Sequence, residues 1–210
     1  MDIETKIQSL QEMIEELNLD LLDDSIVKSN QLPFLYKEQL YRVKMPKQKD
    51  LTIAKSIEDK LKIQLLRDSN SITKKALIKV LKENQGIDIL ELNETKDKYT
   101  NRLKDLYMEL ATTSDKESKR INNLKNSINE VKSNHMQVSI EISDLLSPSI
   151  EHQVETAYIK YLTTVCTEKN IEDNQWELAW KDYETFENDD TNLPNLANLC
   201  FTRLFLTLRN

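Results

Sequence analysis

The sequence predicts a mainly α-helical protein, with an antiparallel coiled-coil helical hairpin on a helical body and a small β-hairpin near residues 32–45. Glycine occurs once in 210 residues, whereas hairpin-rich and α/β folds use glycine repeatedly in turns that need positive φ. Apolar residues recur every three to four positions along most of the chain, as they do on one face of an α-helix. Charged residues make up 31% of the chain, a proportion that suits an elongated helical protein.

The coiled-coil hairpin is expected over residues 88–146. Two apolar seams with helical spacing are joined there by the polar link 112–117, and a short link makes the two helices antiparallel. Lys96 interrupts the first seam and His135 interrupts the second. We interpret His135 as a polar residue that fixes the register of the helices or sits where the hairpin frays, because the seam offers no second metal ligand at a suitable spacing.

The segment 32–87 is expected to hold the β-hairpin and two short helices. Polar and apolar residues alternate around the turn KEQ in residues 32–45, which is typical of paired strands. A two-stranded hairpin is marginal alone, so it should lie on the helices or pair with the edge of another chain. Its candidate partner contacts are Tyr36 and Tyr41. Gly86 is expected to end the second helix in the left-handed conformation.

The N-terminal arm, residues 1–31, has the pattern of an amphipathic helix over residues 3–22. The pattern stops before a polar stretch, so the arm is expected to dock on its own body or on a partner. The candidate contact residues on its apolar face are Ile7, Leu10, Ile14 and Leu17.

The C-terminal region, residues 147–210, is expected to be helical. A first helix is predicted to run to about Glu168, on the basis of its apolar spacing. Trp176, Trp180 and Tyr183 follow at i, i+4 and i+7, which predicts an anchoring helix whose aromatic side chains belong to the core.

The last predicted helix starts at Pro194 and is apolar on nearly all sides. Such a helix must be buried, either in the core of its own chain or in an oligomer. Phe201 and Phe205 are therefore candidate contacts with a partner. Cys166 and Cys200 lie in apolar helical contexts, and we expect both to be buried free thiols.

The charges of the chain are segregated into blocks. Residues 1–24 carry a net charge of −7, residues 42–82 carry twelve cations against four acids, and residues 151–190 carry eleven acids against three lysines. Blocks of opposite sign attract each other, so the basic block should pack near an acidic one, within the chain or between copies. The candidate contacts for self-association are Lys74, Lys75 and Lys79.

Most catalytic chemistries lack their residues in this sequence. A single glycine excludes the glycine-rich phosphate loops, and the only histidines are His135 and His152. His152 and Glu155 stand in the reverse order to the Glu-x-x-His pairs of di-iron bundles. We therefore expect no enzyme activity, cofactor or metal. The N-terminus lacks the apolar region of a secretory signal, and the least charged stretch, residues 193–208, is too short to span a bilayer.

Four short motifs carry a resemblance to a known family. They are YRVKMP at residues 41–46, SITKKALIKVLKENQGI at 71–87, YIKYLTTVCTE at 158–168 and WELAWKDYETFEND at 176–189. In this order, and with a coiled coil between the second and third, the chain resembles a group of tailed-bacteriophage tail assembly chaperones and virion structural proteins. A turn with glycine usually precedes the tryptophan in that group, whereas this chain reads NIEDNQ.

The resemblance implies a non-enzymatic structural or assembly protein of a tailed-phage particle, made in the cytoplasm of the bacterial host. Its partners would be other proteins of a large assembly, including copies of itself. One alternative is a soluble regulatory protein that binds a host protein. Another is a nucleic-acid binder that uses residues 42–82, although the acidic net charge and the absence of aromatic residues after Tyr41 in this block count against it.

Overall fold

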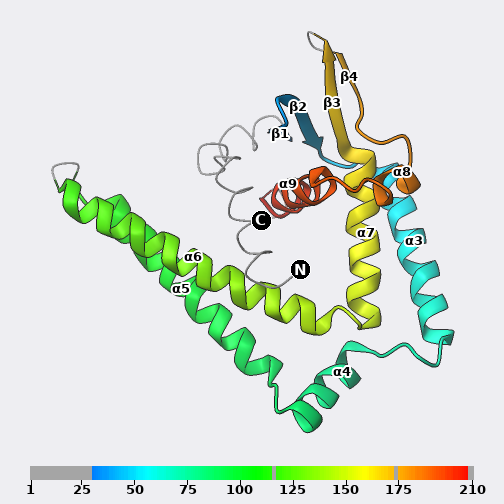
Figure 1. Ribbon diagram of the computed structural model, residues 1–210, viewed down its shortest axis with the longest axis horizontal. Coiled ribbons are helices and arrows are strands. Elements are labelled where there is room, and N and C mark those ends of the chain that lie inside the picture. Colours follow the sequence, from blue (N-terminus) through cyan, green and yellow to red (C-terminus); the bar gives the residue numbers. More distant parts are fainter. Residues whose placement is uncertain (1–29, 115–116, 173–174, 208–210) are drawn as a thin grey trace. The chain divides into compact units, whose positions relative to one another are not determined.

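The computed structural model describes residues 30–114, 117–172 and 175–207, with side chains up to residue 205. Helices make up most of the described chain (Figure 1), which confirms the mainly helical class. The described residues form two compact units. The first unit holds residues 72–149, and the second combines residues 30–71 with residues from 150 onward.

The first unit is built on the predicted antiparallel helical hairpin. Helices α5 (Ile89–Thr112) and α6 (Ser118–Leu146) lie side by side (Figure 1), and at 1.5 Å per residue they are about 36 and about 44 Å long. Their seam buries the apolar residues that the periodicity placed there. The members of this seam are Leu103, Leu106, Leu110, Leu124, Ile128 and Val131.

The first unit has a second apolar cluster, around Leu77, Leu81 and Leu146. Helix α4 (Lys74–Val80) leads into one π-helical turn, η2 (Leu81–Gln85). Gly86 then has φ of 71°, and the N–H of Ile87 donates to the carbonyl of Leu81 at 3.1 Å. This is the expected left-handed helix end, and it folds Ile87 back onto the cluster.

The two interruptions of the apolar seams, Lys96 and His135, lie near each other across the hairpin. Burial lowers the pKa of His135 from its ordinary value, and the positive charge of Lys96 lowers it further. Both effects favour the neutral imidazole over the imidazolium. The role of His135 in fixing the register of the two helices stays a prediction.

The second unit combines helices with a four-stranded antiparallel sheet of order β1-β2-β3-β4. Helices α3 and α7 pack against each other, and α9 packs on β1, β2 and α7. The bounds are β1 Gln31–Tyr36, β2 Gln39–Lys44, α3 Gln48–Arg67, α7 Ile150–Cys166, β3 Thr167–Glu172, β4 Gln175–Leu178, α8 Tyr183–Glu187 and α9 Leu193–Thr207.

The core of the second unit lies on the inner face of the sheet. Cys166 and Cys200 are buried free thiols, as predicted, and burial raises the pKa of both to about 12. A thiol in this state is largely unreactive. The largest fully buried side chains of this core are Leu32, Val43, Leu162, Leu196, Phe201 and Leu204.

The prediction of one anchoring helix through Trp176, Trp180 and Tyr183 was wrong, and only Tyr183 starts a helix, α8. Residues after Cys166 form β3 and β4, and Trp176 lies in β4 opposite Asn170, whereas Trp180 follows that strand. The reason is long-range pairing, because β3 is aligned on β2, which lies far away in sequence. Tertiary pairing of this kind overrides local helical spacing. Trp180 is nevertheless a core residue, 5% exposed, with its indole N–H donating to Asp189.

The apolar last helix, α9, is buried in its own unit and not in a contact with a partner. Phe201 and Phe205 of α9 are 0% and 7% exposed, and their rings stack at 5.4 Å. They fill the core of their own unit, which is one of the two places that a helix apolar on nearly all sides can occupy. Neither side chain is available to a partner.

The turn of the β1–β2 hairpin holds two side chains in an unfavourable conformation. Lys37 and Glu38 have φ of 47° and 64°, as a two-residue turn with the right twist requires. Asn-Gly is the preferred pair for this turn because both residues accept positive φ.

Replacing Lys37 and Glu38 by Asn and Gly should therefore stabilise the second unit by about 1 kcal/mol. Urea unfolding followed by tryptophan fluorescence measures this directly, because Trp176 and Trp180 both lie in this unit. The control Lys37→Arg with Glu38→Gln keeps both strained positions and should change nothing. A loss of stability in the Asn-Gly variant would contradict the assigned turn.

The His135 position predicts a pH dependence of the hairpin. Since the folded pKa lies below the ordinary value, the unfolded chain takes up the proton first. Stability is then complete well above about pH 6.5, the unfolded pKa, and falls as the pH decreases through this value toward the folded pKa. Compared with His135→Asn, the wild type should lose more stability as the pH falls through about 6.5. Thermal unfolding by circular dichroism measures both chains; an equal response would refute the prediction.

Candidate protein-binding face of the sheet

The sheet of the second unit has one buried and one open face. Strand alternation places Leu32, Phe34 and Val43 on the inner face, where they are at most 4% exposed. The opposite parity defines what we call the outer face. Its residues are Gln31, Pro33, Leu35, Leu40, Arg42, Lys44, Glu168, Asn170, Trp176 and Leu178.

The centre of the outer face is a charged cluster across three strands. The Glu168 carboxylate accepts hydrogen bonds from Arg42 Nε at 2.8 Å and from Lys44 Nζ, and Arg42 Nη2 lies 2.7 Å from the same carboxylate. The Arg42 guanidinium also lies 4.0 Å from the centroid of the Trp176 ring. One arginine therefore binds a carboxylate of β3 and stacks on an aromatic ring of β4.

The electrostatics of Glu168 follow from two opposed effects. Burial by itself raises the pKa of this carboxyl, since its side chain is only 13% exposed. The hydrogen bonds and charges of Lys44 and Arg42 lower the pKa, and together they outweigh burial, so that the folded pKa lies below the ordinary value. Glu168 is held in its ionised form by its two partners.

Exposed apolar side chains surround this cluster. Leu35 is 60% exposed, Leu178 is 46% exposed and Leu40 is 37% exposed, and Pro33 is exposed beside them. Apolar groups around ordered Trp and Arg side chains are the composition of protein-binding hot spots. The face is chemically suited to bind another protein.

The free edge of β1 is less suited to binding than the face. The two-residue turn makes Tyr36 and Gln39 a hydrogen-bonded pair, so every second residue from Tyr36 toward the start of β1 forms backbone hydrogen bonds with β2. The hydrogen bond from Met45 N–H to the Asn30 carbonyl, at 3.1 Å, fits this alternation. Pro33 lies between two of these bonded residues, so its backbone nitrogen is directed to the outer edge of β1. Proline has no N–H to donate there to a further strand. β2 itself is paired on both sides, so the hairpin pairs within its own chain.

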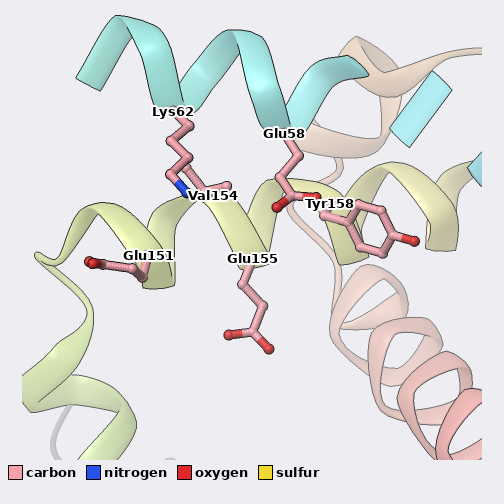
Figure 2. Close-up of a pocket in the computed structure, with 6 residues that line it drawn as sticks. All are labelled: Glu58, Lys62, Glu151, Val154, Glu155 and Tyr158. Atoms are coloured by element: carbon pink, nitrogen blue, oxygen red, sulfur yellow. The ribbon is translucent and has the colours of Figure 1, made fainter. Parts of the chain in front are cut away.

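A pocket of about 300 Å³ lies between α3 and α7 of the same unit. Figure 2 shows Glu58 and Lys62 reaching from α3 toward α7, while Glu151 and Glu155 point away from the pocket centre. Val154 forms its buried floor. Among the described residues, no group of three or more His, Cys, Asp and Glu side chains is placed to hold a metal ion. The pocket is an open groove whose charged lining residues are three glutamates and Lys62.

The predicted contact residues fall in several places. Tyr36 and Tyr41 belong to the inner face, where the Tyr41 ring stacks on Phe34 at 5.5 Å and burial raises the pKa of Tyr41. On α4 of the first unit, Lys74, Lys75 and Lys79 are exposed, and Lys79 lies 3.8 Å from Glu83. Outside the described residues lie Ile7, Leu10, Ile14 and Leu17.

The outer-face residues are not among the contacts predicted from the sequence. The alternation of residues 40–45 predicts a strand but does not tell which of its two faces is exposed, and the aromatic side chains favour the face of Tyr41. A usable signal was present in the sequence: Trp176 and Leu178 alternate with Glu177, which is a strand pattern.

Comparison with family models, with curated protein sequences and with solved structures gives no match to this chain. In the described part of the chain, the helices are too short or too polar for any of them to cross a lipid bilayer.

Glu168 yields a pH prediction for the outer face. Its carboxyl should titrate below its ordinary value of 4.5 in an NMR titration, and the stability from its ion pairs should be present above that value and lost as the pH falls through the folded pKa. Lys44→Gln should raise this pKa. Lys169→Gln is the matched control, since Lys169 pairs with Glu177 instead, at 2.7 Å. If the pKa of Glu168 is the same in Lys44→Gln as in the wild type, the assigned cluster is wrong.

Proposed function

We propose that this chain is a non-enzymatic structural or assembly protein of a tailed-phage particle, which binds other proteins through the outer face of its sheet. The observation that carries the binding surface is the ordered Arg42–Trp176 stack with exposed leucines around it. The side chains at the centre are held by Glu168 in one conformation. A partner therefore meets a rigid surface and loses little conformational entropy in ordering it.

The phage setting of the proposal rests on the sequence resemblance over residues 34–190. Three of the resembling motifs contribute residues to the outer face or lead into it: YRVKMP supplies Arg42 and Lys44, YIKYLTTVCTE ends on Glu168, and WELAWKDYETFEND starts at Trp176. In the proposal, the motifs are shared because they build the same binding face.

Nucleic-acid binding by the basic block 42–82 is a weaker candidate. Within the described residues, cations of this block form ion pairs at Arg42, Lys44, Lys55, Lys79 and Lys82. The block is also divided between the two units at residue 72. Neither arrangement gives the continuous basic groove that tracks a phosphate backbone.

The test is co-sedimentation of an affinity-tagged chain produced in its native setting, with partners identified by mass spectrometry. The tag should travel with particles or with assembly intermediates. Replacing Leu35 and Leu178 by Glu should reduce the co-sedimenting fraction about tenfold or more, because two apolar contacts then become charged. The matched control is Leu90→Glu, at a leucine of α5 that is 64% exposed and lies in the other unit.

Two results would overturn the proposal. A tag that stays in light fractions with one soluble host protein identifies a regulatory binder. Equal loss of co-sedimentation in the Leu90→Glu control shows that the outer face is not the binding surface.

A further inference from the structure

Helix α3 carries an exposed stripe that is both basic and apolar. At 100° per residue, an arc of about 80° around the helix axis contains Lys49, Ile53, Lys60, Ile63 and Arg67. All five side chains are exposed, with Ile53 at 37% and Ile63 at 52%. No acidic residue of α3 falls within this arc. We call these five residues the α3 stripe.

The stripe lies on the side of α3 away from the core. Ala54 is fully buried and Ile57 and Leu61 are partly buried, and they mark the side that packs on α7. The stripe therefore presents two exposed isoleucines between three cations. An acidic amphipathic helix complements such a surface, because its apolar side chains can pack on the isoleucines while its carboxylates face the cations.

A segment of this chain has that chemistry. Residues 12–22, EMIEELNLDLL, lie outside the described structure and carry four acids and no cation. If helical, Met13, Ile14, Leu17 and Leu21 share one side, with Glu12, Glu16 and Asp20 beside them. Such a helix is about 16 Å long, close to the roughly 15 Å between Ile53 and Ile63 along α3.

The described chain begins close to the N-terminal end of α3. Asn30 accepts a hydrogen bond from Met45 N–H at 3.1 Å, and α3 begins three residues later, at Gln48. Residues 23–29 can span at most about 25 Å. With the shortest linker path, the C-terminal end of a helix over residues 12–22 would lie beside the N-terminal end of α3, and such a helix would run antiparallel to α3.

We propose that residues 12–22 bind along the α3 stripe of their own chain as an antiparallel helix. The apolar side of the segment then faces Ile53 and Ile63, with the acids against Lys49, Lys60 and Arg67. The outer face of the sheet is a poorer site for this segment, because Glu168 stands at its centre. The inference does not depend on the proposed function, since it concerns a contact within one chain.

Hydrogen exchange of the full chain, read by mass spectrometry, tests this contact. The amides of residues 12–22 should exchange about tenfold or more slowly in the wild type than in Lys49→Glu/Lys60→Glu/Arg67→Glu. Exchange of the β2 and β3 amides in the same samples reports whether the variant is folded. The matched control is Lys74→Glu/Lys75→Glu/Lys79→Glu, which makes the same charge change in the other unit and should leave residues 12–22 slow.

A charge swap provides the second variant. Adding Glu12→Lys, Glu16→Lys and Asp20→Lys to the stripe variant restores opposite charges and should restore slow exchange. Fast exchange of residues 12–22 in the wild type, or unchanged slow exchange in the stripe variant, would overturn the proposal. Slow exchange only at about 100 µM and not at about 1 µM would also overturn it, by showing that the segment binds a second copy.

Discussion

The second unit depends on one ionic arrangement, the binding of Glu168 by Arg42 and Lys44. Arg42 precedes Glu168 by 126 positions in the sequence and Lys44 precedes it by 124. Their ion pairs with Glu168 join β2 to β3. The rest of the unit is arranged on this joint: β1 extends the sheet on one side, β4 extends it on the other, and α7 runs directly into β3. A carboxylate that is 13% exposed would be costly without partners, so this pairing also selects against other alignments of the two strands.

The same arrangement creates the surface to which we assign binding. Arg42 is held in position by Glu168, and its guanidinium covers the Trp176 ring. Leu35 and Leu178 remain exposed on the two edge strands of the sheet, β1 and β4. The segregation of charge in the sequence has a partial physical explanation here, since a basic block and an acidic block meet within one chain.

The structure separates what local patterns predict from what they do not. The helical hairpin was predictable because its seam, with Leu106 and Leu124, repeats over many turns and both helices are close in sequence. The end of the helical segment formed by α4 and η2 was predictable because Gly86 is the single glycine, and Gly86 has the φ that such a helix end requires. β3 was not predictable from TEKNIE alone, because its alignment comes from Arg42 and Val43 of a distant strand. For the same reason the outer face was missed: its centre exists only after residues from three strands come together.

A double-mutant cycle on Arg42 and Glu168 tests this account most directly. Arg42→Gln, Glu168→Gln and the double variant would be unfolded in urea and followed by fluorescence of the two tryptophans, both of which belong to this unit. The account predicts a coupling free energy of about 1 kcal/mol or more, because the pair is charge-assisted and largely shielded from solvent. A coupling indistinguishable from zero would show that the pair does not hold the two strands together.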